Sequence, residues 1–180
     1  MTQGVTIALI VVVALLAVAG LVVAGIFLWR RTVRRYVVTL IGKREGVQAA
    51  LKTVESLVGT LAKATDGELV AFALDASAEE RKTLEEVAQQ MAILSDELAT
   101  MPLPKHLYDA ANELADAAKE LMRQTGGLTG KEGVEALDAL GEVDLGRVRT
   151  HVDEGVRLLG EQAERYDVDD TAVYGGGLYI

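Results

Sequence analysis

The sequence predicts an all-α protein, in which a single N-terminal transmembrane helix continues into a cytoplasmic four-helix-type bundle with two short extra helices. Residues Val5 to Trp29 form an apolar run without one charged side chain. Apolar residues then recur at alternating spacings of three and four along most of the chain, which is typical of helices with one buried face. No segment before the C-terminal tail indicates a strand.

The apolar run is long enough to cross the hydrocarbon core of a bilayer as a helix. Residues 1–4 carry no Lys or Arg, whereas Arg30, Arg31, Arg34 and Arg35 follow the run at once. Flanking cations stay on the cytoplasmic side, so we expect the N-terminus outside and the C-terminal domain in the cytoplasm, at the plasma membrane. A cleaved signal peptide has the opposite charge order. Trp29 is placed as an interfacial anchor.

Charge divides the rest of the chain. Residues 30–64 hold eight basic and two acidic side chains, whereas residues 65–180 hold ten basic and twenty-five acidic ones. The basic segment is explained by membrane topology, and binding of a specific lipid by the arginines is the sharper alternative. The acidic body argues against nucleic-acid binding, which needs a basic surface.

One apolar seam continues from the membrane segment toward the helical body. Its positions alternate at spacings of four and three, and eight of the nine are apolar: Val33, Val37, Leu40, Arg44, Val47, Leu51, Val54, Val58 and Leu61. Ala50, Leu57 and Ala64 widen this stripe beyond a strict coiled-coil seam. We therefore favour a helix of an intramolecular bundle over a dimeric parallel coiled coil.

Two further helices are predicted after a break at residues 65–67 and a short apolar segment at 69–74. Ser77 and Glu80 match a capping box at the start of the first helix, and Pro102 and Pro104 end it. Its inward positions are Leu84, Val87, Met91, Leu94 and Leu98. Those of the next helix are Leu107, Ala110, Leu114, Ala117 and Leu121. The short connection predicts an antiparallel hairpin.

The last part of the body has the same pattern. Glycines predict a loop at residues 126–130, and Thr129 with Glu132 is expected to cap a short helix that Gly141 ends. Asp144 is expected to start the final long helix. The predicted domains are an anchor at 1–29, a basic juxtamembrane helix at 30–46, the bundle at 47–166 and a flexible tail at 167–180.

The search for chemistry yields no site. The segment Gly126 to Lys131 fails the phosphate-loop pattern, because Thr125 and Glu132 stand where a glycine and a magnesium ligand are required. The chain has no Cys. His151 and Glu154 share a helical face but lack the second set of ligands that a bundle metal site needs. We predict no enzyme activity, cofactor, metal or small-molecule substrate.

Three features are candidates for binding. One is a row of carboxylates on one helix face: Asp109, Glu113, Asp116 and Glu120. We favour a solvated face, and the alternative is a site for a cation or a basic partner. The second is the small-residue face of the membrane segment, suited to helix association: Ala17, Gly20 and Ala24. The third is the tail, where apolar residues follow three glycines: Tyr174, Leu178, Tyr179 and Ile180.

These observations favour a non-catalytic, single-pass membrane protein whose cytoplasmic bundle acts as a scaffold or adaptor through protein–protein contacts. Its expected partners are the membrane and another protein subunit or a second copy. Two alternatives stay open. The chain is an accessory subunit that docks through its transmembrane helix, or it is a membrane-proximal signal-relay protein. A frayed tail without a role also remains compatible with the sequence.

Overall fold

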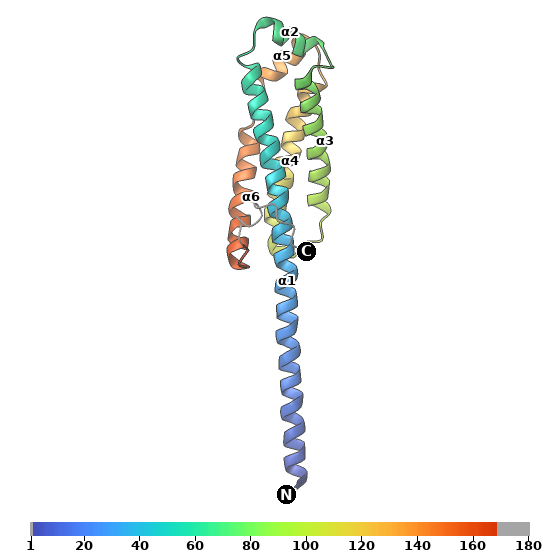
Figure 1. Cartoon of the computed structure of the whole chain (residues 1–180), viewed down its shortest axis with the longest axis vertical. Coiled ribbons are helices and arrows are strands. Elements are labelled where there is room, and N and C mark those ends of the chain that lie inside the picture. The colour runs from blue at the N-terminus through green and yellow to red at the C-terminus, as the bar shows by residue number, and fades with distance from the viewer. Residues whose placement is uncertain (1, 169–180) are drawn as a thin grey trace.

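The computed structural model describes the backbone of residues 2–168 and the side chains of residues 15–168. These residues form helices joined by short loops, and no strand lies among them (Figure 1). In chain order the elements are α1 (Thr2–Leu61), α2 (Asp66–Leu74), α3 (Glu79–Thr100), the 3-10 turn η1 (Lys105–Leu107), α4 (Tyr108–Thr129), α5 (Val134–Gly141) and α6 (Gly146–Arg165). The prediction of an all-α protein is confirmed.

Helix α1 has two parts with different surroundings. It is 60 residues long, or about 90 Å at 1.5 Å per residue. Its N-terminal part stands clear of the other helices, and its C-terminal part lies beside α3, α4 and α6 (Figure 1). Every large apolar side chain described between Leu15 and Trp29 is more than half exposed. Within residues 15–168, α1 is the one helix that is long and apolar enough to cross a membrane.

The apolar seam predicted along α1 is buried where this helix meets α3, α4 and α6. Val33, Val37, Leu40 and Val47 are fully buried, and of the nine seam positions only Val58 is half-buried rather than buried. The side chains that cover the seam belong to the same chain. Burial begins only four residues after Trp29, so the exposed and the packed parts of α1 meet within about one helical turn.

Helices α3 and α4 form the hairpin that the sequence predicts, and they make the most extensive helix–helix contact. All ten inward positions predicted for these two helices are buried. Alanines Ala110, Ala117 and Ala118 are at most 1% exposed on α4, since small side chains there let the neighbouring helices approach closely. Helix α6 packs on the opposite side of α4, through Val148, Val152 and Leu159 among others.

The helix ends differ from the prediction in several places. The capping box at Ser77 is wrong, because the Ser77 N–H and hydroxyl both donate to Asp75 Oδ1, at 2.8 and 2.6 Å. The Asp75 carboxylate takes the place that the Glu80 side chain would have in a capping box, because it lies closer to the Ser77 donors along the chain. A pair of this kind occurs instead at Thr65, whose N–H and hydroxyl donate to Glu68 Oε2 at 2.7 and 2.8 Å. Helix α2 consequently starts at Asp66, inside the predicted break.

The glycine-rich loop predicted at residues 126–130 is also wrong over its first four residues. Helix α4 continues to Thr129, and Leu128 is 1% exposed, so burial of this side chain offsets the helix penalty of the neighbouring glycines. Gly133, and not Thr129, precedes α5; its φ of +59° suits a residue without Cβ, and its N–H donates to Ala73 O at 2.8 Å. Asp144 lies two residues before α6, where Oδ1 accepts the Gly146 N–H.

The end of the packed helices that lies farthest from the N-terminus is closed by α2 and α5 (Figure 1). Arg81 is 4% exposed and fastens this end together. Its guanidinium donates to Phe72 O, Ala73 O, Thr129 O and Lys131 O at 3.2, 3.3, 2.8 and 2.5 Å, and lies 5.8 Å from the centre of the Phe72 ring. One buried cation thereby satisfies carbonyls at the ends of α2 and α4 that no helical N–H can reach.

Candidate membrane-proximal site

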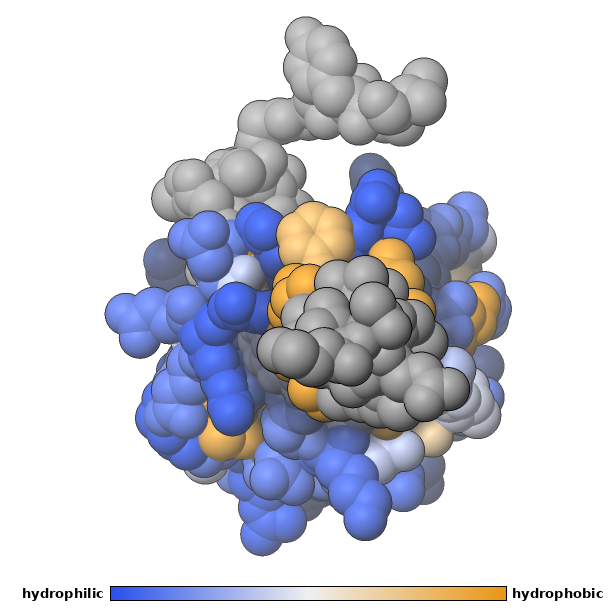
Figure 2. Space-filling view, turned by 90° about the horizontal axis from the view of Figure 1, so that it is seen from below, coloured by the Kyte–Doolittle hydropathy of each residue, from blue (hydrophilic) through white to orange (hydrophobic). Residues whose placement is uncertain are grey.

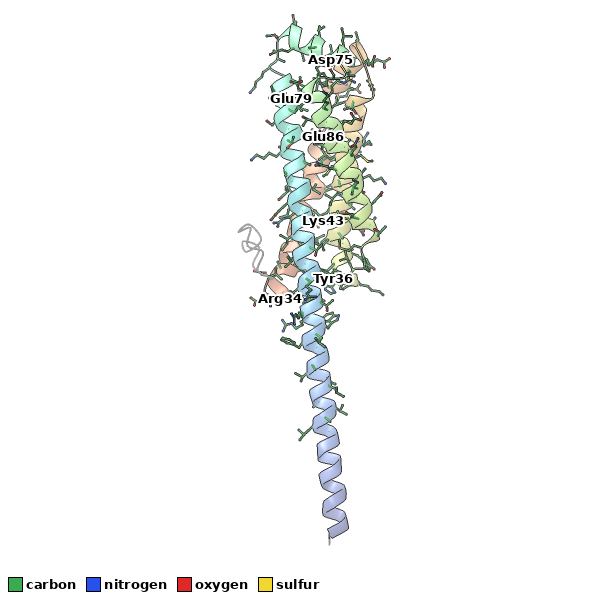
Figure 3. The ribbon with its side chains drawn as sticks, turned by 45° about the vertical axis from the view of Figure 1, so that its right-hand side comes forward. Arg34, Tyr36, Lys43, Asp75, Glu79 and Glu86 are labelled. Carbon is green, nitrogen blue, oxygen red and sulfur yellow. The ribbon has the colours of Figure 1, made fainter. Side chains whose placement is uncertain are left out.

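The candidate site lies at the opposite end, where α1 leaves the other helices. Phe27 and Leu28 are 67% and 61% exposed, whereas Val33 is fully buried. Viewed along α1 from its N-terminal end, this face of the molecule is mostly hydrophilic, with apolar side chains gathered around the emerging helix (Figure 2). Arg34 lies at this junction, at the level of the end of α6 (Figure 3).

The end of α6 determines one wall of the site. Asp167 N–H donates to Glu164 O and Val168 N–H donates to Ala163 O, which is the hydrogen-bond pattern of a Schellman motif. Asp167 takes the left-handed conformation that this motif requires, with a φ of 53°. This turn brings the Asp167 carbonyl to α1, where it accepts a hydrogen bond of 2.6 Å from Arg34 Nη2.

Three rings from separate elements meet beside this turn. The stacked rings of His106, from η1, and Tyr166 have centres 5.5 Å apart, and the Trp29 ring lies 6.0 and 6.2 Å from them. The Tyr166 hydroxyl and His106 Nε2 share a hydrogen bond of 3.0 Å. Tyr166 is 5% exposed but Trp29 is 53% exposed. The cluster thus joins α1, the α3–α4 connection and the end of α6 while leaving the indole partly free.

A pocket of about 400 Å³ opens next to these rings. We call it the arginine pocket; its lining residues are Phe27, Arg30, Arg31, Arg34, Tyr166 and Asp167. Among the described residues, neither Arg30 nor Arg31 makes an ion pair, and the Arg34 contact is to a neutral carbonyl. Arg35 is exposed and does not line the pocket. Trp29 thus lies beside His106 and Tyr166, and three of the four predicted membrane-surface arginines line a pocket with Tyr166. Arg35 stands apart.

The other predicted binding residues are not assembled into a site in the part of the chain that is described. Ala17, Gly20 and Ala24 are exposed, and a Cβ added to Gly20 would meet nothing within 4 Å. Tyr174, Leu178, Tyr179 and Ile180 lie outside the described residues. The small-residue face and the tail stay predictions.

The predicted row of carboxylates is divided among different partners. Glu113 Oε2 lies 2.7 Å from His151 Nδ1, which joins α4 to α6. Glu120 accepts from Arg123 Nε and Nη2 at 2.9 and 2.5 Å and from Gln124 at 2.9 Å. His151 and Glu154 do not pair, because Glu154 binds Arg157 instead. Residues 15–168 contain no group of three or more side chains suited to hold a metal ion.

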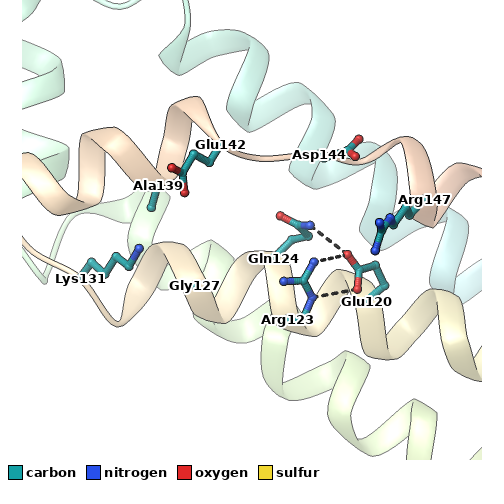
Figure 4. A pocket seen from close by; sticks show the side chains of 9 residues that line it. All are labelled: Glu120, Arg123, Gln124, Gly127, Lys131, Ala139, Glu142, Asp144 and Arg147. Carbon is teal, nitrogen blue, oxygen red and sulfur yellow. Dashed lines mark hydrogen bonds and ion pairs between the residues drawn. The ribbon is translucent and has the colours of Figure 1, made fainter.

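Glu120 also lines a second pocket, of about 360 Å³, between α4 and the α5–α6 connection (Figure 4). Its walls carry both charges, from Arg123, Lys131 and Arg147 and from Glu120, Glu142 and Asp144. The Arg123 guanidinium lowers the pKa of Glu120 from its usual 4.5 to about 2. A carboxylate with so low a pKa is a poor general base at neutral pH, so this pocket is a weaker candidate for chemistry.

No family model, curated protein or solved structure matches the chain. The site therefore stands on its own geometry. Sequence reasoning singled out Trp29 and the arginines, but it did not find the contacts of Trp29 with His106 and Tyr166. Those residues are 77 and 137 positions away along the chain, and no local pattern in the sequence points to the contact.

Proposed function

We propose that this chain is a non-catalytic, single-pass membrane protein whose helical body acts as a scaffold or adaptor at the cytoplasmic face. In this proposal α1 crosses the plasma membrane with its N-terminus outside, and its C-terminal part forms a four-helix-type bundle with α3, α4 and α6. The observation that carries it is the change along α1. An exposed apolar stretch that ends at Trp29 continues, in the same helix, into a seam buried from Val33 onward.

The charges support the orientation. Arg30, Arg31, Arg34 and Arg35 follow the exposed apolar stretch directly, and cations at this position favour the cytoplasmic side. Trp29 is 53% exposed beside them, as an interfacial anchor would be. The remaining body is acidic, which would keep it away from an anionic membrane surface and leave its sides open to partners.

Topology can be tested cleanly because the chain has no cysteine of its own. We expect a Gln3→Cys variant to react with a membrane-impermeant maleimide on intact cells, and a Lys63→Cys variant to react only after permeabilisation. Changing all four arginines to Glu should invert or scramble this pattern. Labelling of Lys63→Cys on intact cells that carry the native arginines would contradict the proposed orientation.

The scaffold role is tested by purification in mild detergent of the full chain beside a version that ends at Val168. This version keeps the Schellman motif and the Asp167 contact to Arg34. Proteins that copurify with the full chain but not with the shorter version would assign partner binding to the tail. Proteins kept by both would assign it to the helices. If neither sample retains a protein above the level of an unrelated single-pass control, the scaffold proposal is refuted.

A second candidate function is that of an accessory subunit held through its transmembrane helix. The exposed face at Ala17, Gly20 and Ala24 favours it, because small residues allow close approach of another helix. A Gly20→Leu variant should then lose its partner while the version ending at Val168 keeps it. Under the scaffold proposal, Gly20→Leu leaves binding unchanged.

A further inference from the structure

The arginine pocket combines cations with exposed apolar surface in an order that follows the layers of a bilayer. Phe27, Arg30, Arg31 and Arg34 are spaced i, i+3, i+4 and i+7, so they share one face of α1. This face meets Tyr166 and Asp167 at the end of α6. Phe27 and Arg34 are about 10 Å apart along the helix axis, which is enough to cross one polar headgroup layer of about 5–8 Å into the edge of the hydrocarbon.

The charge in the pocket is unbalanced. Three guanidinium groups line it, and the one acidic side chain among its lining residues is that of Asp167. Cations gathered in this way repel one another unless an anion lies between them. The planar guanidinium binds phosphate oxygens with two parallel hydrogen bonds, which a single ammonium group cannot do. A phosphate therefore fits the donors that Arg30 and Arg31 leave available.

The apolar part of the pocket favours a phospholipid over a free phosphate ion. Phe27 is 67% exposed, and it continues the exposed apolar surface that runs down α1 through Ile26 and Val23. A free phosphate ion would leave this surface in water, whereas the acyl chains of a phospholipid would cover it. Phe27 then contacts the acyl chains near the glycerol, and the arginines contact the headgroup.

We propose that the arginine pocket binds an anionic phospholipid, with the phosphate held by Arg30, Arg31 and Arg34 and the acyl chains lying along α1 past Phe27. The inference rests on the proposed membrane-spanning role of α1. Because Arg34 also holds the Asp167 carbonyl, the lipid would contact the same guanidinium that joins α1 to the end of α6. The bound lipid is thus placed to stabilise the junction between membrane and body.

The test uses the full chain in nanodiscs of phosphatidylcholine with a minority of phosphatidylglycerol. The protein is transferred to mild detergent, and the lipids that remain bound are identified by native mass spectrometry. We expect phosphatidylglycerol to be enriched over its share in the nanodisc. Arg30→Gln and Arg31→Gln should each lower this enrichment roughly tenfold, because each removes charge-assisted hydrogen bonds to the phosphate.

Arg35→Gln is the matched control, because it removes the same charge from the same segment but from outside the pocket. Its enrichment should stay within about twofold of the native chain, because an exposed charge that does not contact the bound phosphate contributes little. If Arg35→Gln loses as much as Arg31→Gln, the arginines act only as a diffuse basic segment and the proposal is overturned. Helical content by circular dichroism verifies that each variant folds.

Other occupants give different results, and each would overturn the proposal. Release of phosphatidylglycerol by millimolar inorganic phosphate would make the pocket a simple anion site. Enrichment that develops only after Asp169 and Asp170 are changed to Asn would assign the pocket to the chain's own acidic residues. Flotation with vesicles distinguishes a failure of the lipid site from a failure of the membrane anchor. A chain that floats but shows no enrichment refutes the lipid site alone, and a chain that does not float refutes the membrane anchor as well.

Discussion

Replacing Arg81 should loosen the end of the body that is closed by α2 and α5. An Arg81→Met variant keeps an apolar stem of similar length but removes the donors to four carbonyls. Two of the four hydrogen bonds are short, at 2.8 and 2.5 Å, and each contributes about 1.5–3 kcal/mol as a bond from a charged donor. The two at 3.2 and 3.3 Å contribute less.

The two short bonds together give about 3–6 kcal/mol, and the net cost should lie near the lower end of this sum. Removing the cation also removes the cost of burying it, so we expect Arg81→Met to lower the free energy of unfolding by about 3 kcal/mol. Urea unfolding of the full chain in mild detergent, followed by circular dichroism, measures this difference. Amide hydrogen exchange should show the largest loss of protection in α2 and α5, since Arg81 contacts the end of α2 and the loop that precedes α5.

Lys82→Met is the control, because it removes the same charge from the next position, where the side chain is exposed. Its unfolding free energy should change by less than about 0.5 kcal/mol. Equal urea midpoints for the two variants would refute the reasoning and show that the carbonyls near Arg81 are satisfied by water. A loss spread evenly over all helices would show that Arg81 does not act locally.

Three other predictions concern α4 and the helix α6 that packs on it. Because Arg123 holds the pKa of Glu120 at about 2 in the folded protein against 4.5 normally, the stabilisation is present above pH 4.5 and lost as pH falls toward 2. Arg123 is largely exposed, so this amounts to at most about 1 kcal/mol, and urea unfolding of Glu120→Gln should lack that part of the pH dependence. In Gly155→Ala the new Cβ would lie 3.0 Å from Leu114 Cδ2. This contact should destabilise α6 by about 1–2 kcal/mol relative to the control Gly160→Ala, in which no atom lies within 4 Å of the new Cβ. Gly160→Ala alone should raise the thermal midpoint, because alanine is the better helix former, and a lower midpoint would contradict the exposed position of Gly160.

The helices and their buried faces could be predicted because a spacing of three and four residues directly specifies one side of a helix. The same spacing also includes Arg81, which the apolar positions alone do not indicate. Arg81 lies three residues before Leu84 and so continues the buried face of α3, just as Arg44 continues that of α1. An arginine in register with an apolar seam predicts a buried cation, although its acceptors come from distant segments.

The helix ends and the membrane-proximal site were harder to predict for a different reason. Ser77 and Glu80 have the spacing of a capping box, yet Asp75 competes for the Ser77 donors, and these alternatives differ by only about 1 kcal/mol. The contact of Trp29 with His106 and Tyr166 depends on η1 and the end of α6 lying at the level where α1 leaves the other helices. This alignment depends on the lengths of several helices together, so no single segment of the sequence predicts it.

The unbroken course of α1 has a mechanical consequence. A stretch of 25 residues such as Val5 to Trp29 is about 37 Å long as a helix, more than a hydrocarbon core of about 30 Å, and such a helix accommodates by leaning. If α1 spans a membrane as proposed, the body would lean by the same angle, because α1 is one continuous helix with no hinge between its two parts. An inclination of about 20° would carry the end near Arg81 some 15 Å sideways, along a lever of about 43 Å from Val33 to Leu61. Local bilayer thickness would thus set how far from the anchor's axis the tip reaches.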